Sequence, residues 1–154
     1  MRPKREETRN SDCAYFVSTQ TQSRKSFFRY ERWARLMLTM LNHYDGEGYK
    51  LHACVVMPDH LHLLITPFGS IEKSVQLSKG GFSFRAKRER EWKGEIWQQG
   101  FTDHRIRNEK DWLRHMDYIR MNPVDASLAT DSVLYEFLRF PKGEYPQGLK
   151  PTPL

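Results

Sequence analysis

Residues 49–67 constrain the fold more than any other stretch, because they hold two strand-like segments with almost no chain between them. The first, "YKLHACVVMP", covers 49–58, and the second, "HLHLLITP", covers 60–67. Both are rich in residues that favour β-structure, and each ends at a proline. Met57, Pro58 and Asp59 form a tight connection between them. We therefore predict that the two strands form an antiparallel hairpin.

The segments on either side of this hairpin alternate between strand-like and helix-like patterns. Residues 15–22 alternate β-branched, aromatic and polar side chains, which predicts a first strand. Residues 28–44 place apolar side chains at helical spacing. Residues 70–91 begin with the capping sequence "SIEK" and predict a basic helix that the two glycines of "KGGFSF" interrupt. A fourth strand is expected within 95–107, with Gly100 allowing a bulge or bend.

A last helix follows, with signals at both of its ends. Asn108 is a good N-cap, and Asp111 lies at the third helical position, where a negative charge favours the helix N-terminus. The helix is expected to stop at Asn122, because Pro123 disfavours helical geometry in the residue before it. The predicted order is thus β-α-β-β-α-β with an added helix and a tail. This order is typical of an α+β, ferredoxin-like fold with an antiparallel sheet.

The composition suits one domain and excludes several classes of protein. No run of this 154-residue chain approaches the ~20 apolar residues that a membrane helix needs. The charged N-terminus lacks the apolar segment of a secretory signal, and two distant cysteines fit neither a disulfide framework nor a zinc finger. We expect a cytoplasmic protein with a flexible arm over 1–13, a main domain over 14–128 and a C-terminal extension over 129–154.

The charge of the chain indicates the kind of partner to consider. There are 25 Lys and Arg against 19 Asp and Glu, which gives a net charge of +6. Basic residues cluster at Arg24, Lys25 and Arg29, over 79–93, and at Arg105 and Arg107. Such clusters are compatible with binding nucleic acid. They are equally compatible with a basic surface that has no partner.

Two histidines stand out in the second strand of the hairpin. Because successive strand side chains point to opposite faces, His60 and His62 share one face and can converge on a metal ion. Asp59 lies just before them and could orient a ring. The pattern also fits a strand with two polar positions on its wetter face. A metal site needs a further ligand from elsewhere in the chain.

The last helix offers that ligand and a nucleophile. Trp112, Met116 and Ile119 form an apolar stripe at helical spacing, and Tyr118 and Asn122 fall on another stripe, one turn apart. A tyrosine beside a metal that polarises a phosphate can attack phosphorus. The alternative is that Tyr118 is an amphipathic residue at the edge of the core and Asn122 an ordinary helix-terminal residue.

Four blocks, in order, resemble one known family. "MPDHLHLL" (57–64) resembles the His-hydrophobic-His motif of HUH nucleases, and "YIRMNPV" (118–124) resembles the catalytic-tyrosine motif of single-tyrosine, IS200-like transposases. "KGGFSFRAK" (79–87) and "IWQQGFTDHRIR" (96–107) resemble the intervening blocks of the REP-associated tyrosine transposases. The resemblance covers roughly residues 14–128.

The resemblance implies a bacterial enzyme that cleaves and rejoins single-stranded DNA carrying palindromic hairpins. Tyr118 would attack the scissile phosphate and form a 5′-phosphotyrosine link, and His60, His62 and a residue of the tyrosine helix would hold Mg²⁺ or Mn²⁺. No small-molecule cofactor and no membrane is implied. IS200-like transposases have Gln as the third ligand where this chain has Asn122, which puts that ligand in doubt. They also work as dimers, whereas the REP-associated branch resembles a monomer, so we expect a monomer and keep a dimer open.

Seven basic residues are the candidates for contact with DNA: Lys79, Arg85, Lys87, Arg88, Arg105, Arg107 and Arg120. Trp92, Trp97 and Phe101 could stack on bases, although core packing is the better interpretation for the last two. For Asp111 and His115 we expect a solvated helix face. Two other functions stay open: an HUH nickase of the replication-initiator or relaxase type, and a hairpin-binding protein without cleavage activity.

Overall fold

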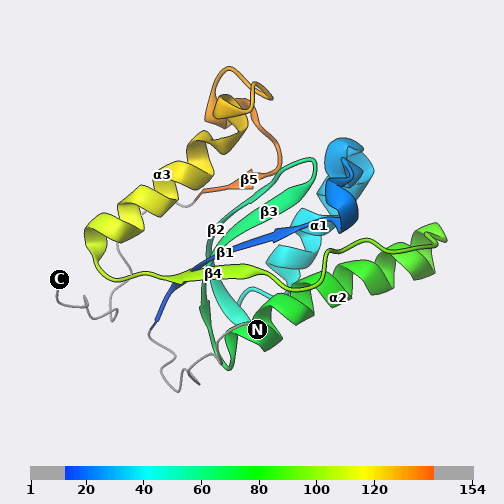
Figure 1. The fold of residues 1–154 in the computed structure, drawn as a ribbon, viewed down its shortest axis with the longest axis horizontal. Coiled ribbons are helices and arrows are strands. Elements are labelled where there is room, and N and C mark those ends of the chain that lie inside the picture. The colour runs from blue at the N-terminus through cyan, green and yellow to red at the C-terminus, as the bar shows by residue number, and fades with distance from the viewer. Residues whose placement is uncertain (1–12, 141–154) are drawn as a thin grey trace.

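The computed structural model describes residues 13–140, and within them a five-stranded sheet in the order β4-β1-β3-β2-β5 (Figure 1). Every neighbouring pair of strands is antiparallel. The strands are β1 (Tyr15–Gln20), β2 (Tyr49–Val56), β3 (His60–Pro67), β4 (Thr102–Arg105) and β5 (Leu138–Arg139). The α-helices are α1 (Glu31–His43), α2 (Ile71–Arg90) and α3 (Glu109–Asp125). The predicted α+β, ferredoxin-like order is confirmed.

The helices cover the two faces of the sheet unequally. α1 and α2 lie on one face, where they enclose the larger apolar cluster, and α3 crosses the other face over a smaller one (Figure 1). Trp112, Met116 and Ile119 bury the predicted apolar stripe of α3 in that smaller cluster. None of the helices within 13–140 is both long and apolar enough to cross a membrane.

The β2–β3 hairpin forms as predicted, and its backbone closes tightly. The amide of Met57 donates to the carbonyl of His60 over 2.8 Å, so only Met57, Pro58 and Asp59 separate the strands. The side chain of Leu61, on β3, lies in the larger apolar cluster. Neighbouring side chains of a strand point to opposite faces of the sheet. The histidines on either side of Leu61 therefore face α3.

The expected interruption of α2 is wrong, because the helix runs unbroken through its glycine pair. A Cβ atom on Gly81 would lie 2.6 Å from Oη of Tyr44, which follows α1. The absence of a side chain at Gly81 therefore allows α1 and α2 to pack closely, and it does not interrupt α2. The predicted cap is confirmed: Oγ of Ser70 accepts from the amide of Lys73.

The expected end of α3 at Asn122 is also wrong, since the helix continues to Asp125 with Pro123 inside it. Pro123 lacks one amide, but the amide of Ala126 still reaches the carbonyl of Asn122 over 3.0 Å. Burial of Pro123 against the sheet favours this last turn. The predicted N-cap is confirmed, because Oδ1 of Asn108 accepts from the amide of Asp111.

The chain after α3 returns to the sheet. A 3₁₀ turn over Ser132–Leu134 leads to β5, which pairs with β2 at the edge opposite β4. The hydroxyl of Tyr135 donates to the carbonyl of Val56 over 2.6 Å. The predicted extension thus begins with a segment that belongs to the sheet. Of the arm predicted over 1–13, residues 1–12 lie outside the described residues, as does the tail after 140, whereas Cys13 is buried in the larger apolar cluster.

Substituting the two glycines of α2 by alanine tests the close approach of the helices. Gly81→Ala should lower the free energy of unfolding by about 1–3 kcal/mol, because the new methyl group collides with Tyr44. Gly80→Ala is the matched control: its nearest neighbour is the end of the flexible Gln76 side chain, at 3.1 Å. Its better helix propensity should leave stability unchanged or raise it by up to ~1 kcal/mol. Equal urea midpoints for the two variants would contradict the packing argument.

Candidate active site and metal centre

A cavity of about 740 Å³ opens on the face of the sheet that α3 crosses. Its walls come from β1, β3, α3 and the segment just before β4. It brings together all four residues predicted to form the catalytic centre: His60, His62, Tyr118 and Asn122. Ser18 and Gln20 of β1 pair with His62 and His60 of β3, so the strand register places these side chains along the same wall.

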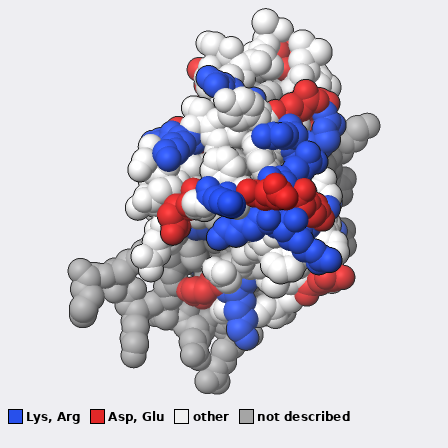
Figure 2. All heavy atoms as spheres, turned by 90° about the vertical axis from the view of Figure 1, so that its right-hand side faces the viewer, with Lys and Arg blue, Asp and Glu red and all other residues white. Residues whose placement is uncertain are grey.

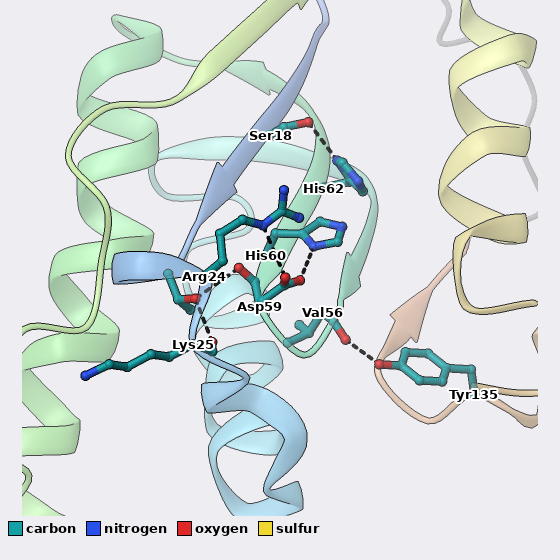
Figure 3. A network of polar contacts seen from close by, with 9 residues as sticks. Ser18, Arg24, Lys25, Val56, Asp59, His60, His62 and Tyr135 are labelled. Carbon is teal, nitrogen blue, oxygen red and sulfur yellow. Dashed lines mark hydrogen bonds and ion pairs between the residues drawn. The ribbon is translucent and has the colours of Figure 1, made fainter. Parts of the chain in front are cut away.

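His62 is held with one ring nitrogen bonded and the other bare. Its Nδ1 is hydrogen-bonded to Oγ of Ser18 over 2.7 Å (Figure 3), while its buried Nε2 has no partner among residues 13–140. Only 6% of the residue is exposed, and burial lowers the pKa of His62 to about 3. The ring is therefore neutral at pH 7, with one nitrogen free to donate a lone pair to a cation.

His60 is oriented from the same side by a carboxylate. Its Nδ1 is hydrogen-bonded to Oδ1 of Asp59 over 2.6 Å, and Nε of Arg24 donates to the other oxygen, Oδ2, over 3.2 Å (Figure 3). Burial acts to raise the pKa of Asp59, but the hydrogen bond and charge of His60 and the Arg24 cation outweigh it and hold the pKa below its usual range. The predicted orienting role of Asp59 is thus met in the geometry, and His60 keeps Nε2 for a ligand.

Tyr118 and Asn122 approach the histidines from α3. The Tyr118 ring lies 5.1 Å from the His62 ring, edge to face, and 48% of the residue is exposed. Phe16 of β1 packs against both rings, at 5.8 and 5.2 Å. One turn later, the buried Oδ1 of Asn122 has no hydrogen-bond partner in the described part of the chain.

These atoms suit a divalent metal. A buried polar atom without a partner costs ~1–3 kcal/mol, and here two of them, Nε2 of His62 and Oδ1 of Asn122, line one cavity with His60. Imidazole nitrogen and amide oxygen are both metal ligands, and a centre with only three protein ligands leaves positions open for substrate. His60, His62 and Asn122 would hold such an ion.

A second cluster of potential metal ligands, formed by His104, Asp111 and His115, lies outside this cavity. This cluster was not predicted from the sequence. Nε2 of His104 is 2.8 Å from Oδ2 of Asp111, and Nδ1 of His115 is 3.2 Å from Oδ1. The three side chains could hold a metal ion, and as they stand they join β4 to α3 through hydrogen bonds. The solvated face expected for Asp111 and His115 is therefore wrong: Asp111 is buried, and only 17% of the His115 side chain is exposed. The spacing of Asp111 and His115 was visible, but not the partner on β4.

Lys79 is the predicted DNA contact whose placement differs most from a surface residue. It is 9% exposed, and its ammonium donates over 3.0 Å to the carbonyls of Gln98 and Gly100. Burial lowers the pKa of Lys79 to about 8. Its charge is used to hold the segment that walls the cavity, so we exclude Lys79 from the DNA surface proposed below.

The other six predicted contacts are spread over two sides of the molecule. Arg85, Lys87 and Arg88 belong to α2, whereas Arg105, Arg107 and Arg120 belong to β4, α3 and the loop between them. Figure 2 shows Lys and Arg gathered on the side that faces right in Figure 1, with acidic residues interleaved. Two of the six are paired locally: Arg85 with Glu89 and Arg120 with Asp117.

The tryptophans of this region serve the core. Trp92 packs edge to face on Phe27 at 4.8 Å, and Trp97 donates from its indole nitrogen to the carbonyl of Lys79 over 3.1 Å. Base stacking by Trp92 is therefore not favoured. Phe101 lies half-buried at the cavity wall. Core packing, the preferred interpretation for Trp97, fits its position.

Comparisons with known proteins show the family of the chain. The family described as "Transposase IS200 like" matches residues 9–122, and the chain belongs to that family. A REP-associated tyrosine transposase of Escherichia coli K12 is 29% identical over 119 residues, which cover 71% of this chain and 66% of that protein. A Haemophilus influenzae Rd protein whose name assigns it to the same group is 33% identical over 84 residues, 47% of this chain and 48% of that one. The alignments thus span just under two thirds and about half of these relatives.

Solved structures share the fold. A REP-associated tyrosine transposase bound to a REP hairpin superimposes with a TM-score of 0.73 at 22% identity, over 90% of this chain and 81% of that one. A Deinococcus radiodurans R1 protein described as a transposase gives a TM-score of 0.54 at 24% identity, over 76% of this chain and 95% of that one. At these identities the likeness supports the fold alone.

Titration with Mn²⁺ tests the metal centre. We expect the parent to bind Mn²⁺ and to gain thermal stability from it, because binding to the folded state alone raises its stability. His62→Ala and Asn122→Ala should each weaken binding by about tenfold or more, whereas His52→Gln, a histidine of β2 outside the cavity, should not. Electron paramagnetic resonance of free Mn²⁺ reports the affinity. Unchanged affinity in both site variants would contradict the ligand set.

Proposed function

We propose that this chain is a metal-dependent endonuclease and strand transferase that acts on single-stranded DNA at palindromic hairpins, in the cytoplasm of a bacterium. One observation carries the proposal: an exposed tyrosine lines one cavity with two buried ligand atoms that have no hydrogen-bond partner among residues 13–140. A nucleophile beside a cation site is what transesterification of a phosphodiester requires. Membership of the IS200-like family supports the same chemistry.

In the proposed reaction, the hydroxyl oxygen of Tyr118 attacks phosphorus while the O3′–P bond breaks. The phenol gives up its proton to water, the departing 3′-oxygen takes up a proton, and the tyrosine remains joined to the 5′-phosphate. A bound Mg²⁺ or Mn²⁺ would polarise the phosphate oxygens. Attack of a 3′-hydroxyl on the phosphotyrosine reverses the step, and since one ester replaces another, rejoining needs no external energy. His60, His62 and Asn122 would hold the cation in the cavity that Tyr118 also lines.

Hairpin DNA is the proposed substrate because a related structure was solved with a REP hairpin bound. The exposed cations Lys87, Arg88, Arg105 and Arg107 are the proposed phosphate contacts. A monomer is proposed as the active form, since α3 and its tyrosine pack against β2 and β3 of their own chain. A dimer in which α3 is exchanged would replace that packing.

Tyr118→Phe tests the nucleophile. The parent, given Mn²⁺ and a labelled single strand containing a hairpin, should form a covalent adduct that survives denaturing electrophoresis. Tyr118→Phe should form none, because the ring stays while the attacking oxygen is gone. Tyr30→Phe, an equally exposed tyrosine outside the cavity, is the control and should react like the parent. An adduct that persists in Tyr118→Phe would contradict the assignment. Tight hairpin binding without any adduct in the parent would favour a binding protein.

The salt dependence of hairpin binding tests the proposed phosphate contacts. Arg88→Gln should weaken binding and lower the slope of log K against log salt by about 0.7–0.9, the effect of losing one phosphate contact. Lys50→Gln removes an equally exposed charge at the start of β2 and should leave the slope unchanged. Fluorescence anisotropy between low and moderate salt measures both. Equal slopes for all three proteins would rule out Arg88 as a contact.

A further inference from the structure

Arg24 lies in a loop that is held in an unfavourable backbone conformation. Ser23 and Arg24 have φ angles of 55° and 51°, the left-handed region that residues other than glycine seldom adopt. The buried Thr21 fixes the loop, since its amide donates to the carbonyl of Asp59 over 3.0 Å. Such strain costs ~1–3 kcal/mol per residue, and it concentrates at functional sites.

The loop directs the Arg24 guanidinium to the catalytic cavity. Nε donates to Oδ2 of Asp59, the carboxylate that orients His60, and Arg24 itself lines the cavity. Its two terminal amino groups have no hydrogen-bond or ion-pair partner within residues 13–140. In Figure 3 the guanidinium lies beside the His60 ring, whereas Lys25 extends away from it.

An arginine held at the cavity by Asp59 could stabilise a scissile phosphate bound there. Attack on phosphorus increases negative charge on the non-bridging oxygens, and fixed cationic donors stabilise that charge. Arginine suits the task because its planar fork can be anchored at one nitrogen while the others donate. Building on the function proposed above, we propose that Arg24 is a catalytic residue whose terminal amino groups donate to a non-bridging oxygen of the scissile phosphate. Asp59 thus holds His60 with one oxygen and this arginine with the other.

Arg24→Gln tests the role, with three readouts: the single-turnover rate of adduct formation, hairpin affinity and Mn²⁺ affinity. We expect the rate to fall by about 100-fold or more, the loss seen when one transition-state donor is removed. Hairpin affinity should stay within about threefold, because one phosphate contact among several contributes little to it. Mn²⁺ affinity should be unchanged, since the Asp59–His60 hydrogen bond remains. Arg24→Lys, which keeps the charge but not the fork, should recover only part of the rate.

Lys25→Gln is the matched control, a neighbouring cation of the same loop that points away from the cavity, and it should react like the parent. Three results would overturn the proposal. The first is that Arg24→Gln forms the adduct as fast as the parent, and the second is that Lys25→Gln loses as much rate as Arg24→Gln. The third is that Arg24→Gln loses Mn²⁺ affinity about tenfold and recovers its rate with excess Mn²⁺, which would make Arg24 a positioning residue for His60. All three leave the proposed function intact. A parent that forms no adduct at all would refute both.

Discussion

The alternation of side chains along β3 is the constraint on which the rest of the structure depends. One set of residues, Leu61, Leu63 and Ile65, enters the large apolar cluster under α1 and α2. The other set places His60 and His62 on the face that α3 crosses. A shift of register by one residue would bury the imidazoles in the core and expose the leucines. The burial energy of the aliphatic side chains therefore also fixes the direction of the two histidines proposed as metal ligands.

Position along that face is set by the neighbours of β3. Pairing with β1 brings Ser18 opposite His62, so one hydrogen bond selects which ring nitrogen stays free. The short turn brings Asp59 next to His60, and the hydrogen bond of Asp59 to Nδ1 of His60 leaves Nε2 free in this ring as well. Met116 and Ile119 hold α3 on the sheet, and Tyr118, on a neighbouring side of the helix, lies 5.1 Å from the His62 ring. Core packing and site geometry thus come from the same few contacts.

Much of this could be predicted from the sequence, because local patterns determine it. The order of strands and helices along the chain up to α3, the hairpin and the apolar stripe of α3 follow from periodicity, whereas β5 was not predicted. The resemblance of "DHLHLL" and "YIRMNPV" led to the cavity residues. What could not be predicted depends on contacts between distant segments. Gly81 was predicted to break the helix because its neighbour in space, Tyr44, follows another helix, α1, far away in the sequence. Lys79 was read as a surface cation because the carbonyls that bind it are about twenty residues away. Ser18 and Arg24 belong to the site through pairings that no local motif reveals.

The central claim is that Tyr118 becomes linked to the 5′ side of the cleaved strand beside a cation held by His60, His62 and Asn122. Mass spectrometry of proteolytic peptides from the trapped protein–DNA adduct tests it most directly. The account predicts one modified peptide, containing Tyr118, whose added mass is that of the nucleotides 3′ of the cleavage site joined through their 5′-phosphate. A modified peptide that lacks Tyr118, or one that carries the nucleotides through a 3′-phosphate, would contradict it.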